Sequence, residues 1–174
     1  IPDNFDSNIE ITINVSETYQ KMKGFGGAFT QASSLIYSKL NDKTKQEIIS
    51  MYFSDNGNKY NMARLTIGSC DFSIESYNYD SIPNDYNLTH FSLTQYDIEE
   101  IIPFINDALS MFNNSEYSNN NEFMFIASAW SAPGWMKDNG YMTCGIDTCE
   151  HCKLKNDPQI YSTYSNYISK YIES

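Results

Sequence analysis

Apolar residues near the amino terminus alternate with polar ones. Residues 9–15 read Ile-Glu-Ile-Thr-Ile-Asn-Val, so every second side chain is apolar. Because successive residues of a strand point to opposite faces of a sheet, this pattern predicts a strand with one buried and one solvated face.

Two short helices are predicted next. Thr30 is placed to cap a helix over roughly 31–40, and Asn41 or Asp42 to cap a second helix over roughly 43–53. Side-chain oxygens of Thr, Asn and Asp accept hydrogen bonds from the free N–H groups of a first helical turn.

Two longer helices follow. Apolar residues at helical spacing predict one over 94–112, where Thr94 and Asp97 have the spacing of a capping box. Pro103 lies inside this pattern, so we expect a kink or a restart there. A Tyr-rich amphipathic helix is predicted to begin at Asp157 and to reach the end of the chain.

Two apolar runs between these helices have the length of strands. Residues 61–67 form one, and 123–127 form a continuous run typical of a strand covered on both faces. A long polar loop, about 70–93, follows the first. The alternation of strands and helices implies right-handed βαβ crossovers and a parallel sheet. Three βα units are fewer than half of a (β/α)8 barrel of about 250 residues, so the sheet of this α/β fold cannot close, and the chain is predicted to be truncated.

The composition excludes several classes of protein. The chain has 174 residues and a net charge of −11; an acidic surface repels phosphate backbones, so we expect no nucleic-acid partner. No apolar run is long enough to span a membrane, and no signal peptide is recognisable. Residue 1 therefore belongs to a protein that is not exported, or it follows a leader outside this sequence. Three glycosylation sequons, at Asn14, Asn87 and Asn113, are the number that chance gives and do not indicate a compartment.

A glycine cluster at Gly24, Gly26 and Gly27 has two interpretations. Its spacing lacks the third glycine of a dinucleotide fingerprint, and no Gly-Lys-Ser/Thr sequence follows. We therefore favour close packing of the backbone over a phosphate loop, and we expect no cofactor.

Chemically useful side chains follow the two predicted strands. Residues 61–67 lead to Asp71, and the second strand leads to Trp130 and Trp135. In parallel α/β sheets, functional groups gather beyond these carboxyl ends. A carboxylate accepts hydrogen bonds from paired hydroxyls, and an indole offers a flat apolar face with one N–H donor. This set suits a carbohydrate ligand.

Each of these residues also has a structural interpretation. Asp71 could cap a helix or turn, and Trp130 and Trp135 could pack in the core. Arg64 within an apolar strand needs a buried anion, which is either the partner in a structural ion pair or an active-site carboxylate.

Five sequence blocks, in the same order and spacing, resemble the lysosomal glucosylceramidases of glycoside hydrolase family 30. Between about residues 9 and 174, the blocks are 23–30, 52–54, 60–61 with Arg64, 69–74 and 130–140. The resemblance implies a retaining β-glucosidase acting on glucosylceramide, built on a (β/α)8 barrel with a β-sheet side domain. Residues 1–23 would be a strand segment of the side domain, and residues 24–174 the first three βα units.

The resemblance also implies roles for single residues. Asp71 and Trp130 match positions that hydrogen-bond glucose hydroxyls, and Arg64 matches an arginine that supports the catalytic carboxylates. Phe72 and Trp135 lie beside matched positions, and we expect them to shape the site. The implied partners are glucosylceramide or a related β-glucoside, an activator protein and a lipid surface. The implied compartment is the lysosomal lumen or the outside of the cell.

The chain departs from the family where catalysis takes place. The Asn-Glu-Pro motif with the acid/base glutamate and the later nucleophile are both absent, and the pair Asn121-Glu122 precedes its strand. Retaining hydrolysis needs two carboxyls about 5 Å apart, so we expect no catalytic residue in this chain, which would be inactive and poorly folded alone. Two alternatives stay open: a relative that cleaves xylosides or β-1,6-glucans, and a non-catalytic, truncated glycan-binding product.

Three of the four cysteines are close in sequence. Cys144, Cys149 and Cys152 lie within nine residues, with His151 among them. Structural zinc sites usually use two separated pairs of ligands, so we expect a disulfide between two of the three, and no metal. Cys70 is expected to be a free, buried thiol.

Overall fold

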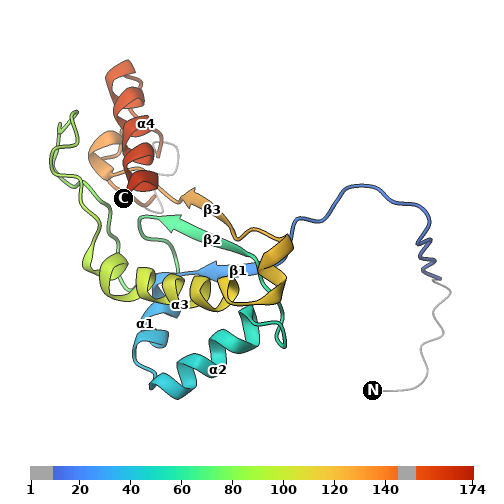
Figure 1. Cartoon of the computed structure of the whole chain (residues 1–174). Coiled ribbons are helices and arrows are strands. Elements are labelled where there is room, and N and C mark those ends of the chain that lie inside the picture. The colour runs from blue at the N-terminus through green and yellow to red at the C-terminus, as the bar shows by residue number, and fades with distance from the viewer. Residues whose placement is uncertain (1–9, 145–151) are drawn as a thin grey trace, which may run out of the picture.

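The computed structural model describes residues 10–144 and 152–174, and a three-stranded parallel sheet lies at its centre (Figure 1). The strands β1 (Gly26–Phe29), β2 (Met62–Ile67) and β3 (Met124–Ala129) are neighbours in chain order. Both pairs are parallel. The prediction of a parallel sheet built by crossovers is confirmed.

Helices connect the strands as the sequence predicts. The helices α1 (Gln31–Ser38) and α2 (Asp42–Phe53) join β1 to β2; η1 (Asp97–Ile101), α3 (Ile102–Asn113) and η2 (Glu116–Asn120) lie between β2 and β3; and η3 (Gly134–Met136) and α4 (Pro158–Glu173) follow β3. Thr30 caps α1, Asn41 caps α2 and Asp157 caps α4, each through a side-chain oxygen. Within the described residues, no helix is both long and apolar enough to cross a bilayer.

The helix between β2 and β3 restarts at Pro103, as predicted. Thr94 and Asp97 form the expected cap, because the Asp97 carboxylate accepts from the Thr94 N–H at 2.9 Å. The turn from Asp97 to Ile101 is a π-helix, and α3 begins at Ile102 with proline in its first turn. Proline has no N–H to donate to the preceding turn, so one wide turn absorbs the lost bond.

Two apolar clusters form the interior. The first, which we call the helix core, lies between the sheet and α1, α2 and α3; its buried members are Phe29, Tyr37, Ile49, Phe53, Ala63 and Ala108. The second, the loop core, lies under the segment that follows β2 and against α4. Its buried members are Ile67, Tyr77, Tyr79, Leu88, Ala132, Met136, Ile160 and Tyr167.

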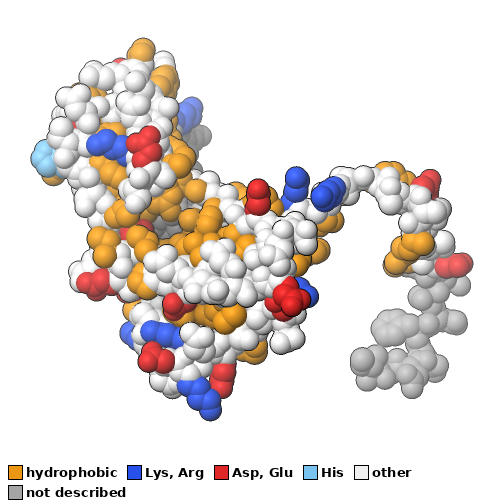
Figure 2. All heavy atoms as spheres, in the orientation of Figure 1, with side chains coloured by type: hydrophobic (Ala, Val, Ile, Leu, Met, Phe, Trp, Pro, Cys, Tyr) orange, Lys and Arg blue, Asp and Glu red, His pale blue; other side chains and the backbone are white. Residues whose placement is uncertain are grey.

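β3 is more exposed than its sequence predicts. Phe125 is 41% and Ile126 53% exposed, and these neighbours point to opposite faces of the sheet. The prediction that this strand is covered on both faces is wrong for this chain. β3 is the last strand of the sheet, and α4 packs mainly on the loop core. Between α3 and α4 lies an apolar groove of about 640 Å³, whose walls include Ile105, Phe125 and Tyr171 (Figure 2).

Residues 10–23 lie outside the compact body in Figure 1. Ile11, Ile13 and Val15 are all more than 80% exposed, and residues 10–25 form no strand. The prediction of a strand over residues 9–15 is wrong for its described part; Ile9 lies outside the described residues. Within the described chain no other strand pairs with this segment, so the alternating pattern has no sheet to join. The assignment of residues 1–23 to a side domain stays a prediction.

The glycine cluster packs closely against β2. A Cβ atom on Gly26 would lie 1.6 Å from the backbone oxygen of Met62, and one on Gly24 would lie 1.8 Å from the side chain of Asn61. The interpretation of close packing is confirmed for Gly24 and Gly26, whereas a Cβ atom on Gly27 would meet nothing within 4 Å.

Candidate functional site

The candidate site begins where β2 and β3 end. Ile67 and Ala129 are register partners, so the two segments that leave the sheet start side by side. One carries Asp71 and Phe72, and the other carries Trp130. The topology therefore brings the predicted residues to one edge of the sheet.

A tight turn presents Asp71 to solvent. The Ser73 hydroxyl accepts from the Cys70 N–H at 3.1 Å, and the Cys70 carbonyl accepts from the Ser73 N–H at 3.1 Å. Asp71 at its tip is exposed, and among the described residues no hydrogen bond or ion pair involves its carboxylate. Asp71 therefore caps no described helix or turn, and both oxygens are available to a ligand.

The turn is also anchored to α1. The Phe72 carbonyl accepts from the Ala32 N–H at 3.0 Å, and the buried Gln31 side chain accepts from the Ile74 N–H at 2.9 Å. The Phe72 ring is 61% exposed beside Asp71. A rigid backbone thus supports two accessible side chains.

Trp130 and Arg64 lie on the same face of the sheet. The Arg64 guanidinium stacks over the Trp130 ring, with 4.4 Å between the guanidinium carbon and the ring centroid. Residues 64, 126, 128 and 130 share this face, because Arg64 pairs with Ile126 and side chains alternate along a strand. Trp130 is 43% exposed, so a ligand can reach its ring.

The expectation of a buried anion beside Arg64 is wrong for this chain. Arg64 is exposed and forms no ion pair with any described residue. Three strands do not enclose this face of the sheet, so the guanidinium keeps its contact with water and uses the Trp130 ring as its partner.

Trp135 is placed differently from Trp130. Its indole N–H donates to the Asp80 carbonyl at 3.0 Å, and its ring packs edge-on against Tyr86 with a centroid distance of 5.8 Å. It is partly buried against the loop core. The core-packing interpretation therefore describes this tryptophan, and its effect on a ligand would be through the shape of the surrounding loops.

The structure adds Lys137, which the sequence did not single out. It is 6% exposed, and its ammonium donates to the Ser131 hydroxyl at 3.1 Å and to the Met142 carbonyl at 2.7 Å. Burial lowers the pKa of Lys137 below its usual range. Lys137 and Trp130 line the same hollow of about 220 Å³. Through its two hydrogen bonds, Lys137 stabilises the loop that follows Trp130. Its only sequence signal was its place in the Trp-rich block.

Glu122 lies at the opposite end of β3. It precedes Met124, the first residue of the strand, so its carboxylate starts from the amino edge of the sheet. This position agrees with the prediction that the Asn121-Glu122 pair is not part of the site.

Cys144 and Cys152 form a disulfide with a Cα–Cα distance of 5.9 Å. The prediction that two of the three clustered cysteines pair is confirmed; Cys149 lies outside the described residues. Cys70 is free, as predicted, but it is half-buried rather than buried, because the turn at residues 70–73 lies at the surface. Among the described residues, no group of three or more metal-ligating side chains is placed to hold an ion.

Comparison with known proteins identifies the domain. Residues 22–174 match the glycosyl hydrolase family 30 TIM-barrel domain. The chain is 39% identical, over 96% of its length, to a protein named putative glucosylceramidase 3 of Caenorhabditis elegans, and 36% identical, over 94%, to lysosomal acid glucosylceramidase of Mus musculus. It spans 30% of each relative. An endo-1,6-beta-D-glucanase of Trichoderma harzianum is 27% identical over 96% of the chain and 34% of that protein.

The fold has solved relatives. SrfJ from Salmonella typhimurium superposes with a TM-score of 0.71 and 31% identity, covering 88% of this chain and 32% of SrfJ. Together with the family match, this confirms the predicted α/β fold as the first part of a (β/α)8 barrel.

Proposed function

Because the chain belongs to glycosyl hydrolase family 30, we propose that it is the N-terminal part of a retaining β-glucosidase that acts on glucosylceramide. In this proposal the segments after β2 and β3 form part of the glucose subsite. The observation that carries it is the pair of accessible side chains, Asp71 and Trp130, at adjacent strand ends. The names of the two most similar relatives described above support the substrate.

Each residue has a chemical role in this proposal. Asp71 accepts hydrogen bonds from two glucose hydroxyls, and a charged acceptor makes such bonds shorter and stronger. Trp130 offers its N–H and one apolar ring face. Arg64 orients the Trp130 ring by stacking on one of its faces, and it supports carboxylates contributed by later strands. Phe72 and Trp135 shape the surroundings.

In this proposal the two carboxyls that carry out the reaction do not come from this chain. Retaining hydrolysis needs one carboxyl to protonate the leaving oxygen and a second, about 5 Å away, to attack the anomeric carbon. Asp71 cannot do both, and Glu122 starts from the opposite edge. We therefore expect the 174-residue chain to release no product from a fluorogenic β-glucoside. Measurable turnover by the purified chain would show that its own carboxyls are sufficient.

Asp71→Asn in the longer enzyme tests the glucose subsite. The change keeps the shape but removes charge-assisted acceptance, which costs about 1.5–3 kcal/mol and therefore about ten- to a hundredfold in kcat/KM. Since contacts to sugar hydroxyls strengthen as the ring flattens toward the transition state, kcat falls as well. The melting temperature stays unchanged, because the Asp71 carboxylate makes no bond among the described residues.

Asp138→Asn is the matched control. Asp138 is also exposed, and within the described chain its side chain accepts from the Lys153 N–H alone, at 3.1 Å, so we expect normal kinetics. Normal kinetics in Asp71→Asn, with or without a lowered melting temperature, would remove Asp71 from the glucose subsite.

A β-1,6-glucan is the second candidate substrate, supported by the Trichoderma harzianum relative. Its lower identity makes it the less favoured one. Release of glucose from glucosylceramide but not from a β-1,6-linked disaccharide by the longer enzyme would support the first candidate, and the reverse would support the second.

The disulfide bears on the proposed compartment. Disulfides persist in oxidising environments, so the Cys144–Cys152 bond supports the lysosomal lumen or the outside of the cell. In this setting an activator protein and a lipid surface would present the sphingolipid. Recovery of the intact bond from protein purified out of lysosomes or culture medium, under thiol-blocking conditions, would test it.

A further inference from the structure

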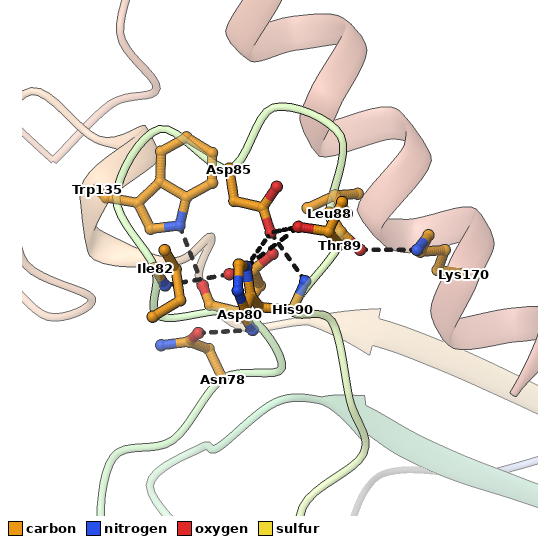
Figure 3. A network of polar contacts seen from close by, with 9 residues as sticks. All are labelled: Asn78, Asp80, Ile82, Asp85, Leu88, Thr89, His90, Trp135 and Lys170. Carbon is orange, nitrogen blue, oxygen red and sulfur yellow. Dashed lines mark hydrogen bonds and ion pairs between the residues drawn. The ribbon is translucent and has the colours of Figure 1, made fainter.

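The loop over residues 78–93 links the segments that follow β2 and β3. At one end, the Trp135 indole N–H donates to the Asp80 carbonyl at 3.0 Å. At the other, the Lys170 ammonium of α4 donates to the Leu88 carbonyl at 2.7 Å (Figure 3). Leu88 itself is 1% exposed. An interaction that stabilises the conformation of this loop therefore also stabilises the positions of η3 and α4, which lie after β3.

A buried carboxyl without a complete set of partners lies at the start of this loop. Asp80 is 2% exposed, and its Oδ1 accepts from the Ile82 N–H at 3.0 Å. Its Oδ2 is fully buried and receives no hydrogen bond from any described residue. An ionised oxygen in this position loses its water and gains no donor, which is strongly unfavourable. Burial, with the nearby Asp85 charge, raises the pKa of Asp80 above its usual range.

Asp85 is the complementary carboxyl. It lies within hydrogen-bonding reach of the Asp80 side chain, and its own side chain is only 7% exposed. Its Oδ2 accepts from the His90 N–H at 2.8 Å and the Thr89 hydroxyl at 2.9 Å, and lies 2.8 Å from His90 Nδ1. Burial opposes ionisation, but these hydrogen bonds prevail and hold the pKa of Asp85 below its usual range.

We propose that Asp80 and Asp85 hold one proton between them, with Asp80 as the donor and Asp85 as the acceptor, and that this proton fastens the loop 78–93 in place. Two carboxyls can share a hydrogen bond only when one is protonated. Protonation of Asp80 turns its unpaired Oδ2 into a hydrogen-bond donor. The three groups that contact Asp85 all lie against the Oδ2 of that residue, so the Oδ1 of Asp85 can accept the bond from Asp80. We call this arrangement the proton clasp.

Titratable, charged and polar groups from three elements surround the clasp. His90, from the same loop, faces both carboxyls and is exposed toward solvent. From α4 come Lys170, bound to the Leu88 carbonyl, and Tyr167, whose hydroxyl accepts from the Tyr79 N–H at 3.0 Å. Trp135 contributes a neutral donor from η3. None of these groups donates to Asp80 Oδ2, so in this proposal the shared proton is its hydrogen-bonding partner within the described part of the chain.

The two carboxyls give opposite pH dependences. The pKa of Asp80 is raised on folding, so its contribution to stability is complete below the unfolded pKa and is lost as the pH rises through the folded pKa. The pKa of Asp85 is lowered, so its contribution is lost as the pH falls through that lower value. Between the two folded pKa values the clasp holds one proton and is closed. Above the pKa of Asp80 two buried negative charges face each other and the loop opens.

Carbon-13 NMR of the aspartate carboxyls in the 174-residue chain tests the proton directly. We expect Asp80 to remain protonated at pH values where Asp85 is already ionised. Titration of Asp80 at or below the ordinary value for aspartate, including in a chain that does not fold, would overturn the proposal.

Amide hydrogen exchange tests the mechanical consequence. Protection of the Ile82 and His90 N–H groups should fall as the pH rises from about 4 to 8, because ionisation of Asp80 opens the loop. Asp80→Asn supplies a permanent amide donor in place of the proton, so its protection should stay high over the whole range. The exposed Asp42→Asn on α2 is the control and should keep the wild-type fall.

The alternative to the clasp predicts the opposite effect of Asp80→Asn on amide protection. If Asp80 acts only as an ionised acceptor for the Ile82 N–H, Asp80→Asn weakens protection at neutral pH. Such a loss, or a wild-type loop whose protection does not change with pH, would overturn the proposal. Asp85→Asn removes the charged acceptor and should weaken protection at acidic pH, so the proposal remains testable if one variant does not fold.

Discussion

The helix core and the loop core hold the molecule together in different ways. The helix core is built from regular elements, and most of its buried side chains are wholly apolar, for example Phe29, Ile49 and Phe53. The loop core contains three buried tyrosines whose polar atoms are mostly engaged: Tyr79 donates to the buried Asp97 at 3.0 Å, and Tyr167 accepts from the Tyr79 N–H. One region depends on burial of apolar area, and the other on completing a polar network.

This difference matters for the candidate site. The loop core includes Ile67, the last residue of β2, and Ala132, two residues after Trp130, whereas the helix core is built from β1, β2 and the helices α1, α2 and α3. Apolar packing has little directional preference, but a hydrogen-bond network is satisfied only in one geometry. The loop core, whose neighbouring segments must position the candidate site residues accurately, is thus the core that contains the directional interactions.

The largest expected effect is a cavity in the helix core. Phe53 is 5% exposed and lies 6.0–6.1 Å, centroid to centroid, from Phe29 and Phe123. Phe53→Ala should lower the free energy of unfolding by about 3–5 kcal/mol, as measured by urea titration. Met51→Ala, exposed on the same helix, should change it by no more than about 0.5 kcal/mol. Equal losses would contradict apolar burial as the source of stability.

A smaller effect is expected from one hydroxyl in the loop core. The Tyr79 hydroxyl donates to Asp97 and accepts from the Gly68 N–H at 3.1 Å. Tyr79→Phe leaves the Gly68 N–H and one oxygen of Asp97, its Oδ1, without the bond to this hydroxyl, and should cost about 1.5–3 kcal/mol. Tyr141→Phe is the control, because Tyr141 is 71% exposed. A loss as small as in the control would show that the network does not contribute.

The two cores should also unfold at different alkaline pH values. Burial raises the pKa of Tyr171 to about 12 from 10.0, and burial likewise raises the pKa of Tyr77, Tyr79 and Tyr167. Raised folded values mean that stability is complete below about pH 10 and is lost as the pH rises through about 12. Tyrosinate absorbance should increase together with exchange of α4 amides, before α2 amides exchange. Earlier loss of α2 would contradict this order.

The smallest effect is expected at the sheet face. The Arg64 guanidinium stacks on Trp130 in an exposed position, where a cation–π contact contributes about 0.5–1 kcal/mol. Arg64→Leu should lower the free energy of unfolding by about that amount and broaden the Trp130 fluorescence. No change in either measurement would mean that the stacked pair is not maintained in solution.

The same contrast explains which features the sequence could predict. The α3 helix and its restart at Pro103 follow from local spacing and from one missing N–H. Leu88 and Tyr79 gave no such signal, because an irregular loop buries residues without a period. The ends of two parallel strands predicted that the segments carrying Asp71 and Trp130 leave the sheet at the same edge, as the pairing of Ile67 with Ala129 shows. The partner of Arg64 could not be predicted, since it depends on how far neighbouring strands enclose that face.

The free side of β3 has a consequence for how such a domain is made. β2 uses both of its sides to pair, whereas within the described chain β3 pairs only with β2. Its outward row of N–H and C=O groups is a template on which one more parallel strand can add in register. A barrel of this kind can therefore grow during synthesis by one strand and one helix at a time, each addition completing the last edge and creating the next. The same template accepts a strand from another molecule, so the rate of synthesis and the local concentration together decide whether the edge is completed correctly.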